Sequence, residues 1–380
     1  AVVRGAKGSC GDVHGAGLGA LDHHHDRARS HVHEPRALAE PSLRGGGRGR
    51  ERGDGQERGG ECEATIHAGA VVYLTIMPPR SSIARAAAQR ASALVAIARW
   101  HEVFVREHRA AALARDPLSF PRRHADRADR ELVALVSALL AFGRIGIITA
   151  KLEVLLARLG PSPAATAAAS TRAALVARLR SFRHRTFAGP DIARLLHAAA
   201  SLQRRDGGLF VALERAWDRH RDLRLALADW TTELRALAWP EGATRSAKHL
   251  LPDPVGPSAA KRLFLLMRWV VRPDDGADLG LSRIPASALT IPVDVHVHRI
   301  ARNLGLTRRD DASRSTAEEI TAALRALSPD DPVRYDMAIC HLGIARQCPS
   351  RRDVVRCEGC ALREVCVHWA DAGPTTDTPR

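Results

Sequence analysis

The feature that most constrains this chain is the helical spacing of its apolar residues, which runs from Ser81 almost to the C-terminus. Amphipathic runs are separated by Gly, Pro or charged turns, and no stretch sustains the alternation of a half-buried strand. Aromatic residues make up only 4% of the chain, which favours helices over β-sandwiches. We therefore expect an all-α fold. The expected helices span 83–113, 128–142, 147–159, 171–182, 190–202, 209–220 and 223–238.

Two later helices are expected from their end signals. Ser315 and Glu318 have the spacing of a capping box, ahead of a helix that ends at Leu327. Asp331-Pro332 predicts the start of the next helix, with Pro at its first position, and that helix runs to about Arg346.

The two ends of the chain differ from this helical part. Residues 1–76 are rich in Gly, Arg and His and have little periodicity, so we expect them to be disordered. Met77 is the first methionine, and we expect the native protein to begin there. The expected organisation is a helical domain over 77–346, a four-cysteine loop over 347–368 and a disordered tail over 369–380.

The charge of the chain indicates its partner. The formal net charge is +15, and residues 1–90 hold 13 basic and 10 acidic side chains, so +12 lies on residues 91–380. A positive folded part is what nucleic-acid binding requires, although an Arg-rich protein can also be basic without binding nucleic acid. No run of 18 apolar residues occurs, so no membrane span is expected. We expect a cytoplasmic monomer that binds double-stranded DNA.

Four of the seven cysteines form a compact pattern near the C-terminus. Cys348, Cys357, Cys360 and Cys366 have the spacing C-x8-C-x2-C-x5-C. Disulfides are not expected in a cytoplasmic protein, whereas four thiolates this close in sequence suit one metal centre. The spacing leaves zinc and an iron–sulfur cluster both open. Cys340 lies outside the pattern and is interpreted as a buried helix residue.

A second stretch, Ile291–Gly305, has the form of a short capped helix. Asp294 stands where a helix N-cap belongs, apolar residues follow at helical spacing, and Gly305 predicts the stop. The side chain of Asp294 can accept the first backbone N–H groups of the helix and still present a carboxylate outward. It can equally be a cap and nothing more.

The segment VDVHVHRIARNLG resembles the V-D-T-H-hydrophobic-x-R segment of the helix-hairpin-helix DNA glycosylase superfamily, the endonuclease III-like fold, with Val295 in place of the usual Thr. From Asp116 onward the chain resembles a little-characterised bacterial family with this glycosylase-like core and a cysteine cluster. The resemblance implies that Asp294 is the catalytic carboxylate. It also implies a [4Fe-4S] cluster on the four cysteines, with zinc as the alternative.

The resemblance places a DNA-binding hairpin within residues 250–271. The family pattern L-P-G-V-G-x-K-T-A is matched by Val255-Gly256 and a helix expected to begin near Ser258. Alignment on Gly256 puts Ser258 in the nucleophile position, with Lys261 three residues later. If Lys261 reaches the pocket it can form a Schiff base, and if Ser258 fills the position the enzyme would activate water instead. A third reading of Lys261 is a phosphate-binding or solvated side chain. Residues 273–280 and 284–290, between Lys261 and Asp294, are expected to form an inserted loop near the pocket.

Further basic residues are expected to contact nucleic acid. Arg144 follows Phe142-Gly143 between two helices, where members of the superfamily insert a wedge into DNA. Arg183 and Arg185 alternate with aromatic residues in FRHRTF, and Arg299 ends the segment that matches the superfamily. The expected function is a DNA N-glycosylase, with or without lyase activity, acting on a damaged or mismatched base. The alternative is a non-catalytic nucleic-acid-binding iron–sulfur protein of the same fold.

Overall fold

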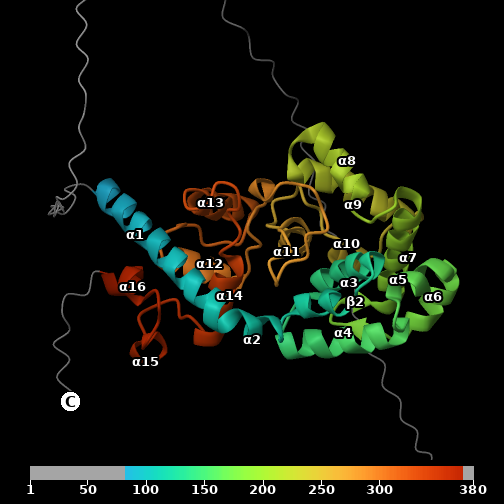
Figure 1. The fold of residues 1–380 in the computed structure, drawn as a ribbon, viewed down its shortest axis with the longest axis horizontal. Helices are drawn as coiled ribbons and strands as arrows, with labels where there is room; N and C mark the ends of the chain where they lie inside the picture. The colour runs from blue at the N-terminus through green and yellow to red at the C-terminus, as the bar shows by residue number, and fades with distance from the viewer. Residues whose placement is uncertain (1–81, 371–380) are drawn as a thin grey trace, which may run out of the picture. The chain divides into compact units, whose positions relative to one another are not determined.

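The computed structural model describes residues 82–370 (Figure 1). The segment 1–76 and the end of the chain, 371–380, lie outside the described residues, so the disorder expected there is not addressed. Within 82–370 most residues are helical, and the strands there are β1 (Arg183–His184) and β2 (Phe187–Ala188), which pair antiparallel. The all-α expectation is confirmed at this level.

The first part of the fold is built around α3 (Arg127–Leu140). Asp126 caps this helix by accepting a hydrogen bond from the backbone N–H of Asp129 at 2.9 Å, and 11 of its 14 residues are buried. The other helices within residues 82–238 are α1 (Ser82–Val103), α2 (Arg109–Leu113), α4 (Ile145–Leu159), α5 (Pro163–Ala169), α6 (Arg172–Leu179), α7 (Gly189–Asp206), α8 (Val211–His220) and α9 (Leu223–Ala238), with 3-10 turns at Pro117–Ser119 and Pro121–Arg123.

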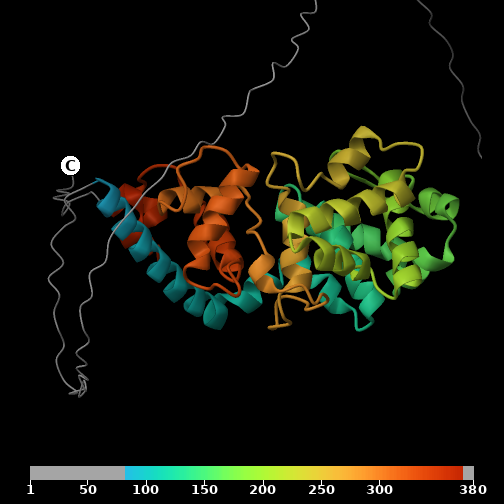
Figure 2. The ribbon, with the colours of Figure 1, turned by 90° about the horizontal axis from the view of Figure 1, so that it is seen from above.

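The second part contains α11 (Lys261–Val271), which packs on α3, and α12 (Val295–Asn303), which packs on α14 (Asp336–Arg346). In Figure 2 the orange and red helices lie on one side together with the blue α1, and the green and yellow helices lie on the other. The other elements are α10 (Arg245–Leu250), α13 (Arg314–Arg325), α15 (Val354–Cys357), α16 (Val367–Ala370), and 3-10 turns at Ala286–Ala288 and Arg363–Val365.

The helix expected over 83–113 is interrupted by a π-helical turn at Phe104–His108. Several other helices begin at residues different from those expected. Helix α11 begins at Lys261 rather than near Ser258, because Ala260 has the left-handed conformation (φ 46°) and cannot continue a helix.

The capping box expected from Ser315 and Glu318 is wrong. Ser313 is the N-cap of α13 and its hydroxyl accepts from the N–H of Thr316, while Glu318 pairs with Arg314. The expected start at Asp331-Pro332 is also wrong, because that stretch forms turns and α14 begins only at Asp336.

The inserted loop 273–281 is tied to the end of α11 by buried ion pairs. Asp278 is fully buried and pairs with Arg268 and Arg272, and the backbone N–H of Leu279 donates to the carbonyl of Trp269 at 2.7 Å. Arg268 in turn binds Asp336 on α14 at 3.0 Å. Buried charges therefore join the insertion, the end of α11 and the first residue of α14.

Candidate functional site

Asp294 is the N-cap of α12 and has one carboxylate oxygen left over. Its Oδ1 accepts the backbone N–H groups of His296 and Val297, both at 2.9 Å. Its Oδ2 lies 3.9 Å from Lys261 Nζ and 3.6 Å from Cys340 Sγ. The expected cap is confirmed, and the second oxygen is directed at two side chains with reactive chemistry.

Lys261 reaches Asp294 from the first position of α11. The left-handed Ala260 ends the preceding loop, and the helix starts with the lysine. The Lys261 side chain is 31% exposed and that of Asp294 is 19% exposed, so both groups are partly accessible from solvent. An ammonium and a carboxylate at this distance can exchange a proton after a small movement.

Ser258 has a different environment. Its side chain is exposed, its hydroxyl accepts the N–H of Ala260 at 3.2 Å, and its backbone forms a β-bridge with Ser313. Of the two candidate nucleophiles, the fold brings Lys261 to the carboxylate and holds Ser258 in the loop before α11.

The hairpin loop 251–260 is held by arginines that bind its carbonyl groups. Arg224 donates to Pro254 O at 2.8 Å, and Arg235 donates to Leu251 O and Pro252 O at 3.1 and 2.8 Å. These contacts occupy carbonyl oxygens on one side of the loop. Gly256, the residue expected to approach a phosphate, is partly exposed within this loop.

A buried carboxylate on α14, that of Asp336, lies near the Lys261–Asp294 pair. Asp336 is 3% exposed and is bound by Arg268, yet its Oδ1 has no hydrogen-bond partner among the described residues. Burial raises the pKa of Asp336 to about 6; Arg268 opposes this shift and the nearby Asp294 adds to it. Cys340 lies one helical turn after Asp336, on the same face of α14.

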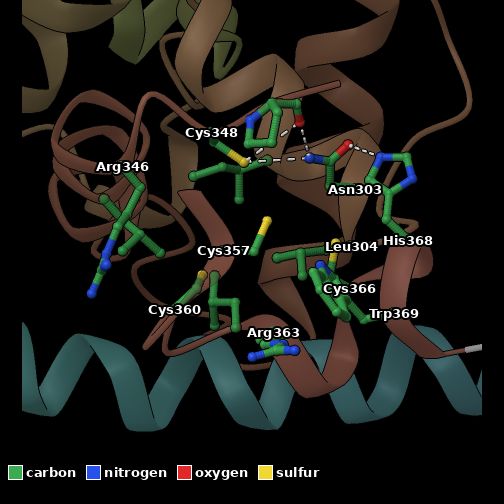
Figure 3. Close-up of a pocket in the computed structure, with 14 residues that line it drawn as sticks. Asn303, Leu304, Arg346, Cys348, Cys357, Cys360, Arg363, Cys366, His368 and Trp369 are labelled. Carbon is green, nitrogen blue, oxygen red and sulfur yellow. Dashed lines mark hydrogen bonds between the residues drawn. The ribbon is translucent and has the colours of Figure 1, made fainter. Parts of the chain in front are cut away.

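The four cysteines of the C-terminal pattern line one pocket. Figure 3 shows the sulfur atoms of Cys348, Cys357, Cys360 and Cys366 around a common space. Among the described residues, however, no group of three or more His, Cys, Asp or Glu side chains is arranged to hold a single metal ion. Burial raises the pKa of Cys366 to about 11, so without a bound cation its thiol stays protonated at neutral pH.

Helix α12 links this pocket to Asp294. Arg299 Nη1 donates to the carbonyl oxygen of Cys348 at 2.9 Å, and Asn303 Nδ2 lies 3.3 Å from Cys348 Sγ. Arg299 was expected to contact nucleic acid, but its guanidinium is engaged with the cysteine loop. Asn303, which sequence reasoning missed, also binds Pro349 O and His368.

The three remaining basic candidates are exposed on the part of the fold formed by α3, α4 and the β-hairpin. Arg144 is the N-cap residue of α4, and Arg183 and Arg185 lie in the β1–β2 hairpin. Arg185 Cζ lies 4.6 Å from the centre of the Phe142 ring, which is 36% exposed. Arginine side chains are thus combined with an accessible aromatic ring, an arrangement suited to phosphate and base contact.

Cys340 and Asp336 are the functional candidates that the sequence did not reveal. Cys340 was interpreted as a buried helix residue; it is only partly buried and its thiol faces Asp294. Cys340 and Asp294 are 46 positions apart, and no local pattern in the sequence connects them.

Comparison with known proteins identifies the family to which the chain belongs. The model of a family described as "Protein of unknown function (DUF2400)" matches residues 116–345, which is more than half of the chain. No curated protein and no solved structure matches significantly. No helix in the described range 82–370 is long and apolar enough to cross a membrane.

Proposed function

Since the chain belongs to the DUF2400 family, whose function is unknown, we propose its activity from its site: a DNA-binding N-glycosylase that removes a damaged or mismatched base. The observation that carries the proposal is the approach of Lys261 Nζ to Asp294 Oδ2 at 3.9 Å. Two residues 33 positions apart meet at the first turns of two helices, and one is a potential nucleophile and the other a potential base.

The proposed chemistry uses the two groups in turn. Asp294 accepts a proton from Lys261, and the neutral amine attacks C1′ of the target nucleotide. The Nζ–C1′ bond forms as the bond to the base breaks. The base leaves with the electron pair and takes up the proton held by Asp294, which becomes a carboxylate again. The C1′–O4′ bond then opens with its electron pair going to O4′, which takes the second proton from Nζ. The product is a protonated imine, which retains the third proton.

The carboxylate has a second role in this scheme. Glycosidic cleavage builds positive charge on the sugar. As Asp294 gives its proton to the departing base, the negative charge that it regains next to C1′ stabilises the transition state. The backbone N–H groups of His296 and Val297 hold Asp294 Oδ1, so Oδ2 is presented at one position. The base would have to be flipped out of the duplex to reach this place.

The DNA-binding surface we propose includes Arg144, Arg183 and Arg185. They are exposed, and Phe142 beside Arg185 offers an aromatic face. The excess of +12 on residues 91–380 supports a polyanionic partner. Gly256, in the loop before α11, is the proposed site of a backbone contact to phosphate.

We further propose that the four-cysteine pocket holds a [4Fe-4S] cluster. A zinc ion would need four sulfur atoms at about 2.3 Å from one point, whereas a cluster spreads its ligands around a larger body. The four cysteines line one pocket, and their x2 and x5 gaps match those of the superfamily that the chain resembles, which favours the cluster over the alternative, zinc. With four thiolate ligands the centre has no open position, so its role is to fix the loop next to α12.

The alternative function is nucleic-acid binding without catalysis. An ion pair between Lys261 and Asp294 is a stable arrangement that needs no substrate, and Val295 replaces the Thr of the superfamily segment. Incubation of the protein with duplexes that carry different lesions, followed by borohydride reduction, separates the two. Cleavage with a covalent adduct supports the Schiff-base scheme, cleavage without an adduct supports water activation, and binding without cleavage supports the alternative.

A further inference from the structure

The thiol of Cys340 is placed against the oxygen of Asp294 that faces Lys261. Cys340 Sγ donates to Asp294 Oδ2 at 3.6 Å, within the range of a hydrogen bond from sulfur. Two backbone N–H groups hold Oδ1. The contacts of Oδ2 therefore decide whether the carboxylate keeps its orientation when Lys261 moves.

Close packing between α12 and α14 fixes this contact. Gly343 lies one turn after Cys340, and a Cβ atom at this glycine would stand 2.9 Å from His296 Cβ. The missing side chain allows the two helices to approach. The approach carries Cys340 to the first turn of α12, where Asp294 lies.

The surroundings keep the thiol protonated. Burial, together with the charges of Asp294 and Asp336, raises the pKa of Cys340 well above its usual range; Lys261 acts in the opposite direction and Asp116 adds to the rise. Toward the carboxylate of Asp294 a neutral thiol acts as a hydrogen-bond donor.

We propose that Cys340 is a positioning residue for the Asp294–Lys261 pair, and this inference rests on the proposed glycosylase function. When Lys261 releases its proton and moves to attack C1′, the ammonium no longer holds Oδ2. The neutral thiol retains its hydrogen bond, so the carboxylate keeps its orientation toward the sugar.

The first test compares Cys340→Ala with Cys340→Ser in borohydride trapping on a cleavable duplex. Alanine removes the donor, and serine supplies a hydroxyl donor at the same position. We expect the alanine variant to form the adduct about tenfold more slowly, as loss of one hydrogen bond to a charged group predicts, and the serine variant to stay within about threefold of wild type. Affinity for DNA should be unchanged in both. Equal loss in both variants, or no loss in alanine, overturns the proposal.

The second test does not depend on activity. The rate of Cys340 alkylation by iodoacetamide is followed by peptide mass spectrometry in the full chain. Asp294→Asn removes a negative charge beside the thiol, so we expect alkylation about tenfold faster at pH 8, because only the thiolate reacts. Lys261→Met removes a positive charge and should slow it. A rate that neither variant changes overturns the placement of the thiol.

Together the two tests separate the inference from the function. If wild type neither cleaves nor traps any duplex, the glycosylase proposal fails. The alkylation rates still decide whether Cys340 holds the carboxylate. If wild type traps but the alkylation rates are unaffected by Asp294→Asn, the function stands and the role of Cys340 is refuted.

Discussion

Arg268 Nη1 lies 3.0 Å from Asp336 Oδ2, and both residues are at most 4% exposed. This pair joins the end of α11 to the start of α14, the two helices that carry Lys261 and Cys340. Asp336 Oδ1 lacks a hydrogen-bond partner among the described residues. The contacts of this carboxylate therefore do not fully replace the hydrogen bonds that water would make with it.

The first prediction concerns the pH dependence of stability. Burial raises the pKa of Asp336 from 3.8 to about 6, so between these pH values the folded protein binds more protons at this site than the unfolded chain. Stability contributed by Asp336 therefore falls as pH rises from about 4 to 6. Relative to Asp336→Asn, wild type should lose roughly 1–3 kcal/mol across this window in denaturant unfolding. A constant difference between the two proteins would contradict the assignment.

The second prediction concerns DNA binding. Affinity for duplex DNA should fall steeply with salt, because each neutralised phosphate releases counterions. The double variant Arg183→Ala/Arg185→Ala should weaken binding and reduce the slope of log K against log salt by about 1–2. Arg172→Ala, an exposed arginine at the start of α6, is the control and should leave the slope unchanged. Binding that is insensitive to salt would exclude a phosphate-contacting surface.

The third prediction concerns the cysteine pocket. Protein purified without oxygen should be brown, absorb broadly near ~400 nm and contain about four irons per chain. Cys357→Ser or Cys360→Ser should lose the colour and the iron, while Cys340→Ser should keep both. If metal analysis finds one zinc and no iron, the proposed cluster is contradicted and zinc is supported.

Much of the fold could be predicted from sequence because its signals are local. The apolar spacing and the charged turn before it locate α9, and the Asp294 cap and Gly305 stop locate α12, since a helix end depends on the few residues around it. The start of α11 could not be predicted in the same way. Its position depends on the left-handed Ala260, a conformation that loop contacts impose and alanine does not signal.

In the candidate site, too, the residues with local sequence signals could be predicted and those that depend on packing could not. Asp294 and the four cysteines stand out by local pattern, whereas the choice between Ser258 and Lys261 depends on how the hairpin is anchored. Arg224 and Arg235 anchor it from a helix distant in sequence, and only the packed structure brings these contacts together. For the same reason Cys340 was not recognised as a neighbour of Asp294.

The fourth prediction concerns Lys261. Lys261→Ala should abolish the borohydride-trapped adduct, because no other described lysine is paired with Asp294. Lys248→Ala, which removes a lysine from α10, is the matched control and should leave trapping intact. An adduct that persists in Lys261→Ala would assign the nucleophile to another residue.

The most direct measurement is the cleavage rate of Asp294→Asn on a duplex that wild type cleaves. Asparagine keeps the shape and much of the capping of α12 but removes the negative charge. We expect DNA binding close to wild type and cleavage slower by about 30- to 1000-fold, which corresponds to roughly 2–4 kcal/mol of transition-state stabilisation. If Asp294→Asn cleaves as fast as wild type, Asp294 is a helix cap alone and the glycosylase assignment is wrong.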